Sequence, residues 1–100
     1  MSQLLYRYQF DAGVEMSEVQ STLVLAILAT ENLYGESQVR LDASHFCDAE
    51  IRSCVIDATT PVGRDINRQF AGFLSREFGE DQFRVERLEH AGAFEAAPAA

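Results

Sequence analysis

Residues 38–59 read QVRLDASHFCDAEIRSCVIDAT, and the fold class predicted below depends mainly on the pattern in these residues. Apolar and polar side chains alternate over 38–47 and again over 50–59, which is the period of a β-strand. Asp48-Ala49 separates the two runs and predicts a turn, although this pair is not among the strong two-residue turns. The stretch is therefore predicted to form an antiparallel hairpin.

The hydrophobic pattern also predicts the register of this hairpin, because a slip by one residue would turn every side chain to the other face. Placing Cys47 opposite Glu50 gathers apolar side chains on one face and mostly polar ones on the other. In this register Leu41 faces Ile56, Val39 faces Ala58, Ala43 faces Cys54, Arg40 faces Asp57 and Asp42 faces Val55.

A strand and a helix are predicted before the hairpin. Residues 4–10 alternate, with an aromatic-rich face made by Leu4, Tyr6, Tyr8 and Phe10. Ser17 and Gln20 have the spacing of a capping box, and Gly35 is a natural helix end, so a helix is expected between them. The inner face of this helix is predicted to carry Val19, Thr22, Leu23, Ala26, Ile27, Thr30 and Leu33.

A second helix and a last strand follow the hairpin. Thr60 is a good N-cap and Pro61 suits the first helical position, while Gly79 ends the helix and residues 82–88 alternate again. The order strand, helix, strand, strand, helix, strand resembles the ferredoxin-like βαββαβ sandwich, an α+β fold with two helices on one face of a four-stranded antiparallel sheet. We expect one domain over residues 1–88 and a flexible tail over 89–100.

The charge balance excludes several classes of partner. Sixteen acids stand against eight arginines and no lysine, for a net charge of -8. Such a chain repels phosphate backbones and anionic membranes, so neither nucleic acid nor a membrane is an expected partner. The apolar stretch 23–29 is much shorter than the ~20 residues of a membrane span, and residues 1–3 show no targeting pattern. The expected location is the cytoplasm.

Two cysteines fit buried thiols in a reducing compartment, and no cofactor is expected. In the predicted register His45, Cys47 and Cys54 share a face and could form a zinc-type set, but packing explains this face better. A disulfide between the cysteines would need a longer hairpin loop with Ile51 in the turn, and is therefore disfavoured.

Two further candidate sites come from residue chemistry. Thr60, Gly63 and Arg64, together with Thr59, could bind an anion at the start of the second helix through hydroxyl groups, free backbone N–H groups and a guanidinium. An ordinary helix cap accounts for most of the same residues. His45 is the only histidine within a predicted element, so it is the candidate general base of an alternative small dimeric enzyme with a pocket between sheet and helices. Its expected partners are Tyr6, Tyr8 and Arg52.

The predicted surface favours binding over chemistry. Val24, Leu25 and Leu28 lie on the side of the first helix away from the predicted core, where contiguous apolar surface marks a partner contact. The outward sheet face carries Phe46 and Val55 among charges of both signs, as a self-complementary dimer face would. The other residues expected on this outward sheet face are Leu5, Ile51, Leu88, Arg7, Arg40, Asp42, Asp57, Arg84 and Glu86. We therefore expect a domain that binds a protein or small ligand, self-associates and has no chemistry of its own.

Overall fold

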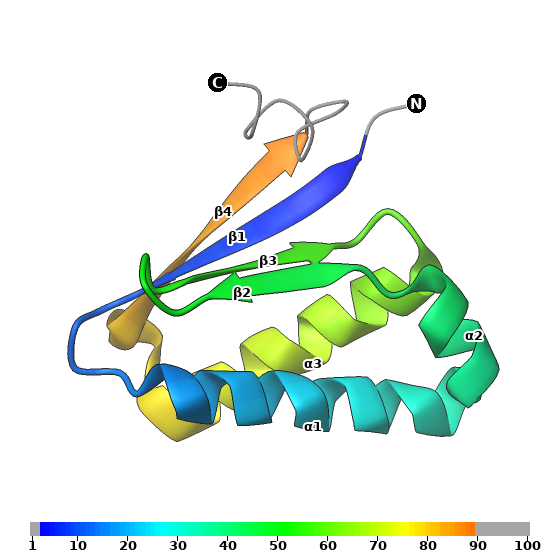
Figure 1. Ribbon diagram of the computed structural model, residues 1–100, viewed down its shortest axis with the longest axis horizontal. Helices are drawn as coiled ribbons and strands as arrows, with labels where there is room; N and C mark the ends of the chain where they lie inside the picture. The colour runs from blue at the N-terminus through cyan, green and yellow to red at the C-terminus, as the bar shows by residue number, and fades with distance from the viewer. Residues whose placement is uncertain (1–2, 90–100) are drawn as a thin grey trace.

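The computed structural model describes residues 3–89 and shows an α+β fold (Figure 1). The predicted tail, 89–100, lies outside the described residues except for Glu89, which ends the last strand. The elements in chain order are β1 (Leu4–Phe10), α1 (Met16–Tyr34), α2 (Glu36–Asp42), β2 (His45–Asp48), β3 (Ser53–Asp57), α3 (Pro61–Phe78), a short 3-10 turn η1 (Glu80–Gln82) and β4 (Phe83–Glu89).

The four strands form one antiparallel sheet in the order β2-β3-β1-β4, so β1 and β3 are central and β2 and β4 are edges. Both long helices lie on the same side of the sheet (Figure 1). α1 packs along α3, α3 contacts β3, and α2 packs against α1 and α3 at one end of this layer. The predicted four-stranded antiparallel sheet is confirmed, while the helix α2 was not expected.

The core lies between the sheet and the helices and is centred on an aromatic contact. The rings of Tyr8 on β1 and Phe70 on α3 are 4.9 Å apart between centroids and are both fully buried. The Tyr8 hydroxyl donates a 2.6 Å hydrogen bond to Oδ1 of Asn67, so the one polar atom of this ring is satisfied. The other buried core residues include Phe10, Val14, Met16, Val19, Leu23, Ala26, Val39, Cys54, Ile56, Val62, Ile66, Leu74 and Phe83.

The predicted helix ends are mostly confirmed. Thr60 is the N-cap of α3, accepting a hydrogen bond from the Gly63 N–H, and Gly35 and Gly79 follow the ends of α1 and α3. The capping box at Ser17 is wrong, because α1 already begins at Met16 and its cap residue makes no side-chain hydrogen bond. Ser17 instead lies inside the first turn.

Only the end of the strand predicted over 38–47 is a strand, because residues 38–42 belong to the helix α2 and β2 begins at His45. Residues 36–42 form α2, stabilised by two contacts four residues apart: the Arg40–Glu36 ion pair and the hydrogen bond from Gln38 to Asp42. Val39 and Leu41 alternate with polar residues, but only Val39 is buried, at 2% exposure against 79% for Leu41. The apparent strand pattern was one buried residue in a short helix, so the predicted Leu41 and Val39 pairings are wrong.

The predicted register of the hairpin is also wrong. Cys47 pairs with Cys54 instead of Glu50, and Phe46 pairs with Val55. The turn is longer than Asp48-Ala49, because it covers residues 49–52 and is closed by a hydrogen bond from the Arg52 N–H to the Ala49 carbonyl oxygen, with Arg52 at a φ of 55°. Asp48 accepts a hydrogen bond from the Glu50 N–H at the start of this turn. The partner of Cys47 thus moves by four residues. An even shift keeps the inward residues of the second strand inward, so Cys54 and Ile56 are buried as predicted.

Candidate functional site

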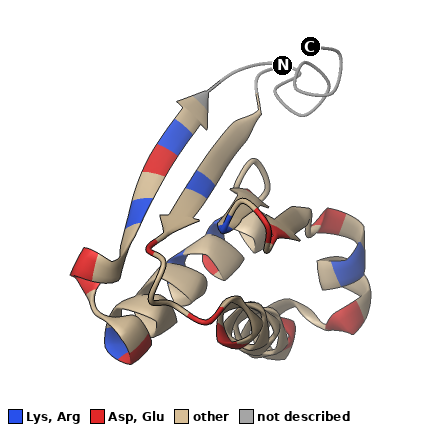
Figure 2. Cartoon of the chain, turned by 60° about the vertical axis from the view of Figure 1, so that its left-hand side comes forward, with Lys and Arg blue, Asp and Glu red and all other residues tan. Residues whose placement is uncertain are grey.

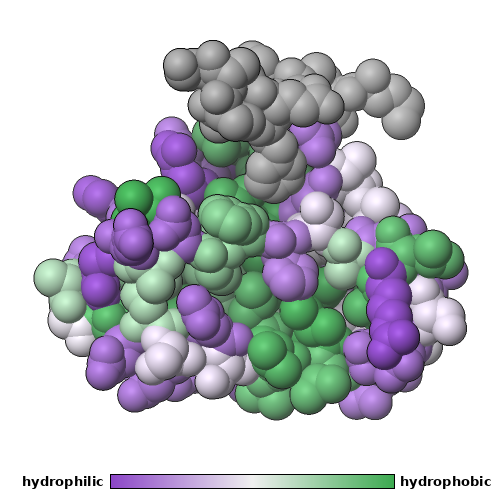
Figure 3. All heavy atoms as spheres, viewed as in Figure 1, coloured by the Kyte–Doolittle hydropathy of each residue, from purple (hydrophilic) through white to green (hydrophobic). Residues whose placement is uncertain are grey.

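The outward side of α1 is an exposed apolar surface, which we call the α1 face and define by Val24, Leu25 and Leu28. These side chains are 54%, 53% and 52% exposed. Their spacing makes them neighbours on one side of the helix. Figure 3 shows apolar side chains gathered along the middle of α1. The exposure expected from the sequence is present, whereas Leu33, predicted to face inward, is exposed.

The charges of α1 lie toward its ends. Glu18 is near its beginning and Glu31 near its end, and the helix has no basic residue. Between these two acids the helix carries only uncharged side chains. The α1 face is therefore an apolar strip bounded by negative charge.

The second exposed surface is the side of the sheet opposite to the helices, which we call the open sheet face. Its most exposed apolar residue is Phe46 on the edge strand β2, at 59%, beside the half-buried Val55 on β3. Leu5 points to this side but is buried at 1% exposure. It therefore does not add the exposed apolar area that the sequence predicts for it. Arg40 and Asp42, also expected here, belong to α2.

The strand register places opposite charges at opposite edges of the open sheet face. Asp48 on β2, Ser53 on β3, Gln9 on β1 and Arg84 on β4 form one row across the sheet, so an acid stands at one edge and an arginine at the other. In the next row Arg7 forms a cross-strand ion pair with Glu86. The bands of charge on β1 and β4 are visible in Figure 2.

A shallow depression also lies on the β1–β4 half of the sheet, lined by Arg7, Gln9, Arg84, Val85 and Glu86. It contains two arginines and an acid, and four of its five lining residues belong to the two rows just described. Because Arg7 is already paired with Glu86, the cation in this depression without such an ion pair is Arg84. The depression is therefore part of the open sheet face.

The candidate base His45 lies on the edge strand β2 and is exposed. Partial desolvation lowers the pKa of His45 below its ordinary value. Tyr6 lies in the same row but on β1, with Ile56 of β3 between the two, which corresponds to about 10 Å across the sheet.

The remaining partners expected for His45 are occupied elsewhere. The Tyr8 hydroxyl is bonded to Asn67, and burial raises the pKa of Tyr8 well above its ordinary value. Arg52 donates to the main-chain oxygens of Asp11 and Val14, joining the β2–β3 turn to the loop after β1. The structure does not bring these residues together around His45, so the enzyme alternative gains no support.

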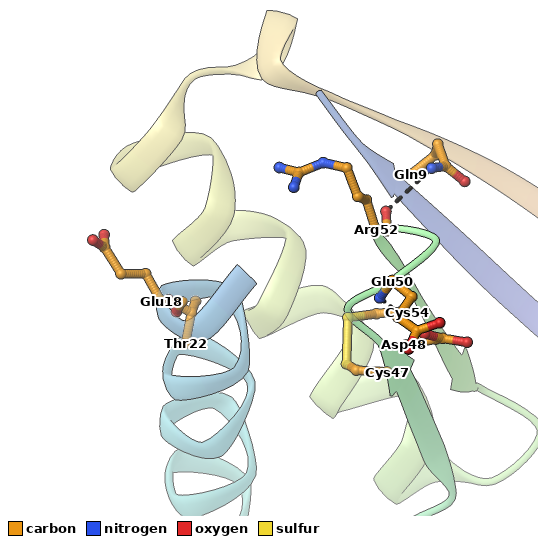
Figure 4. Close-up of a disulfide and its surroundings, with 8 residues drawn as sticks. All are labelled: Gln9, Glu18, Thr22, Cys47, Asp48, Glu50, Arg52 and Cys54. Carbon is orange, nitrogen blue, oxygen red and sulfur yellow. Dashed lines mark hydrogen bonds between the residues drawn. A yellow bond between two sulfur atoms is a disulfide. The ribbon is translucent and has the colours of Figure 1, made fainter. Parts of the chain in front are cut away.

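The cysteines are bonded to each other, which corrects the expectation of two buried thiols. Cys47 and Cys54 are direct cross-strand neighbours with Cα atoms 4.0 Å apart, and their sulfurs form a disulfide (Figure 4). The longer turn, with Ile51 in it, is what aligns the two residues. Without free thiolates the His45–Cys47–Cys54 set cannot bind zinc, and the argument from free thiols to a reducing cytoplasm is lost.

The candidate anion site brings its residues together, but their polar groups have partners within the chain. The Thr60 hydroxyl accepts from the Gly63 N–H at 3.0 Å and donates to the Asp42 carbonyl oxygen at 3.3 Å. Arg64 donates to the Thr59 carbonyl oxygen at 3.4 Å. These contacts are those of a helix cap, so anion binding stays a prediction without structural support.

The chain has no match among protein-family models, curated proteins or solved structures. Among residues 3–89, no group of three or more histidine, cysteine or acidic side chains is placed to hold a metal ion. No helix in that part of the chain has the length and apolar character required to cross a membrane.

Proposed function

We propose that this chain is a non-catalytic binding domain that self-associates as a homodimer through the open sheet face. The observation that carries the proposal is the row with Asp48 at one edge of the sheet and Arg84 at the other. A surface with opposite charges at opposite edges is complementary to a copy of itself.

The geometry of such a dimer follows from the strand order. Consider a second copy placed face to face and related by a twofold axis that runs along the strands. This rotation puts β2 of one copy over β4 of the other, so Asp48 meets the partner's Arg84 and the reverse pair forms by symmetry. Two packed sheets keep their strands within about 30° of each other, which preserves this approximate alignment.

The apolar residues of the open sheet face fit the same arrangement. Phe46 and Val55 lie in the row of the Arg7–Glu86 pair, so each copy places its Phe46 over the partner's Glu86 and its Val55 over the partner's Arg7. The Arg7 guanidinium reaches across to Glu86, so it would lie beside the partner's Phe46 ring, and a guanidinium stacks well on an aromatic ring. Phe46, exposed in the single chain, would thus be covered by the partner.

We also propose that the domain is a ferredoxin-like sandwich to which the short helix α2 has been added. The strand order β2-β3-β1-β4 and the two long helices on one side of the sheet support this architecture. Many unrelated functions occur on this fold, so it adds nothing to the choice of function. The net charge of -8 supports a protein partner over a nucleic acid.

The decisive experiment is a charge exchange across the proposed interface. Sedimentation velocity from micromolar to millimolar concentration is expected to show a monomer–dimer equilibrium. Asp48→Arg and Arg84→Asp each weaken it, and the double variant restores it, because the exchanged charges again meet opposite signs. Asp48→Arg also removes the hydrogen bond from the Glu50 N–H, so circular dichroism must show that each variant is folded.

A matched control separates the two exposed surfaces. Phe46→Glu is expected to abolish the dimer, whereas Leu25→Glu, at a similarly exposed site on α1, leaves it unchanged. A strict monomer at all concentrations, or a double charge variant that dimerises no better than the single ones, contradicts the proposal.

A further inference from the structure

We infer that the α1 face binds an amphipathic helix of a different protein, one whose apolar residues are flanked by lysine or arginine at both ends. The sheet-face dimer is a separate interaction, and this inference does not rest on it. The argument depends on the exposure of Val24, Leu25 and Leu28, on the acids that bound them and on the absence of basic residues from α1.

The fold itself does not need these three residues to be apolar. The buried stripe of α1, which includes Val19, Leu23 and Ala26, already faces the core on the other side of the helix. Polar residues at 24, 25 and 28 would leave that packing intact. Three adjacent, half-exposed aliphatic side chains on a helix are instead typical of a surface that accepts another helix.

A second copy of the chain is a poor occupant of the α1 face. An antiparallel pair of α1 helices centred on Leu25 would set Glu18 of each copy close to Glu31 of the other, and a parallel pair would set each acid beside its equivalent. Both arrangements bring like charges together, which costs free energy at an interface. Neither copy has a basic residue on α1 to offset this repulsion.

Charge complementarity instead identifies a basic partner. Glu18 and Glu31 are thirteen positions apart, which corresponds to about 20 Å along a helix axis. A partner helix of about four turns, apolar in its middle and basic at its ends, would cover the apolar strip and place cations beside both acids. The same acids disfavour docking on an anionic membrane surface.

Both interactions can occur together. The α1 face points away from the core, and the open sheet face lies on the other side of the sheet from the helices (Figure 1). A dimer formed through the sheets would therefore display two α1 faces. Such a dimer binds a two-site partner more tightly than a single domain does.

The test uses the full chain and two synthetic peptides of about 16 residues that share one leucine-rich apolar stripe. One peptide ends in lysines and arginines and the other in glutamates. In isothermal calorimetry the basic peptide is expected to bind at least about tenfold more tightly. It should also shift the amide resonances of α1 in NMR spectra, while β2 and β4 stay unchanged.

Variants of the chain locate the binding site. Leu25→Ser and Leu28→Ser are each expected to lower the affinity of the chain for the basic peptide by about tenfold. The matched control Leu41→Ser, at a site on α2 that is 79% exposed, should change nothing. The double change Glu18→Lys and Glu31→Lys should reverse the preference, so that the acidic peptide now binds better.

Several outcomes would overturn the inference. They are equal binding of the two peptides, binding of neither at millimolar concentration, and unchanged affinity in both leucine variants. Weaker self-association of Leu28→Ser would instead identify a second copy as the occupant. Sedimentation of the wild-type chain with zwitterionic vesicles, lost in Leu28→Ser, would identify a lipid surface. If the Asp48 and Arg84 charge exchange fails to support the sheet-face dimer, the peptide and vesicle measurements can still be interpreted, because they report on the α1 face.

Discussion

Gly63 in the first turn of α3 and Asp57 at the end of β3 are in such close contact that a Cβ on residue 63 would lie 2.0 Å from the Asp57 carbonyl oxygen. That oxygen belongs to the main chain and cannot rotate away as a side chain could. Gly63 is therefore explained by the close approach of α3 to β3 and needs no bound anion to account for it.

Gly63→Ala is expected to lower the free energy of unfolding by about 2 kcal/mol or more, because the added methyl group forces α3 away from β3. The matched control is Gly72→Ala in the same helix, where no atom outside the neighbouring backbone of that helix lies within 4 Å of the added carbon. This change should raise stability by about 0.5–1 kcal/mol through helix propensity. Urea unfolding measures both. Equal effects of the two substitutions would contradict the proposed packing of α3 on β3.

The buried hydroxyl of Tyr8 predicts a loss of stability at high pH. Burial raises the pKa of Tyr8 above the value near 10 that it has in the unfolded chain. Above about pH 10 the unfolded chain releases this proton while the folded chain keeps it. Stability contributed by the neutral hydroxyl is therefore complete below pH 10 and falls above it, by up to about 1.4 kcal/mol per pH unit.

Tyr8→Phe should flatten this decline of the unfolding free energy between about pH 10 and 12. It should also cost about 1 kcal/mol at neutral pH, since the hydrogen bond to Asn67 is lost. Tyr34→Phe is the control, because the Tyr34 hydroxyl is exposed and bonded to Asp65, and its removal should change the slope less. A Tyr8→Phe variant with the wild-type pH profile would show that Tyr8 is not desolvated.

The disulfide predicts a dependence of stability on reductant. It joins the short edge strand β2 to β3, and reduction by a dithiol should lower the free energy of unfolding by about 2–3 kcal/mol, the range expected for so short a loop. Urea unfolding with and without the dithiol measures this. Hydrogen exchange should show faster exchange in β2 after reduction.

The double variant Cys47→Ala and Cys54→Ala is the control, because its unfolding midpoint should not respond to the dithiol. Alkylation before and after reduction reports whether the bond is present at the start. Full alkylation of the unreduced folded chain would contradict the disulfide itself.

The parts of the fold that the sequence predicts correctly are those with local signals. The alternation of β1, the Thr60-Pro61 start of α3 and the glycines after α1 and α3 all depend on neighbouring residues. The helix α2 is missed because Val39 and Leu41 fit a strand and a helix equally well over so few residues. The feature of the sequence that indicates a helix here is the pair Glu36 and Arg40, whose spacing of four residues allows an ion pair on one side of a helix.

The hairpin register could not be predicted from the residue types at the turn. Arg52 has a left-handed conformation that is typical of glycine or asparagine, and nothing in the sequence marks it. Its conformation is fixed by tertiary contacts, since its guanidinium binds main-chain oxygens of the loop after β1. Once the turn is displaced, the disulfide partner and the edge charges of the sheet change with it. The exposure of Val24 and Phe46 depends only on side-chain period and is found as expected.

Arg52 therefore combines an unfavourable backbone with favourable side-chain contacts, and substitutions can separate the two. Arg52→Ala loses the hydrogen bonds to Asp11 and Val14 but keeps the left-handed backbone, so it should cost about 2–3 kcal/mol of unfolding free energy. Arg52→Gly loses the same bonds but relieves the backbone, and should be about 1 kcal/mol more stable than the alanine variant. The main-chain oxygen of residue 52 still accepts from the Phe10 N–H in both, so the difference reports the backbone alone. Urea unfolding of the two variants side by side measures it, and equal stabilities would mean that the left-handed turn is absent.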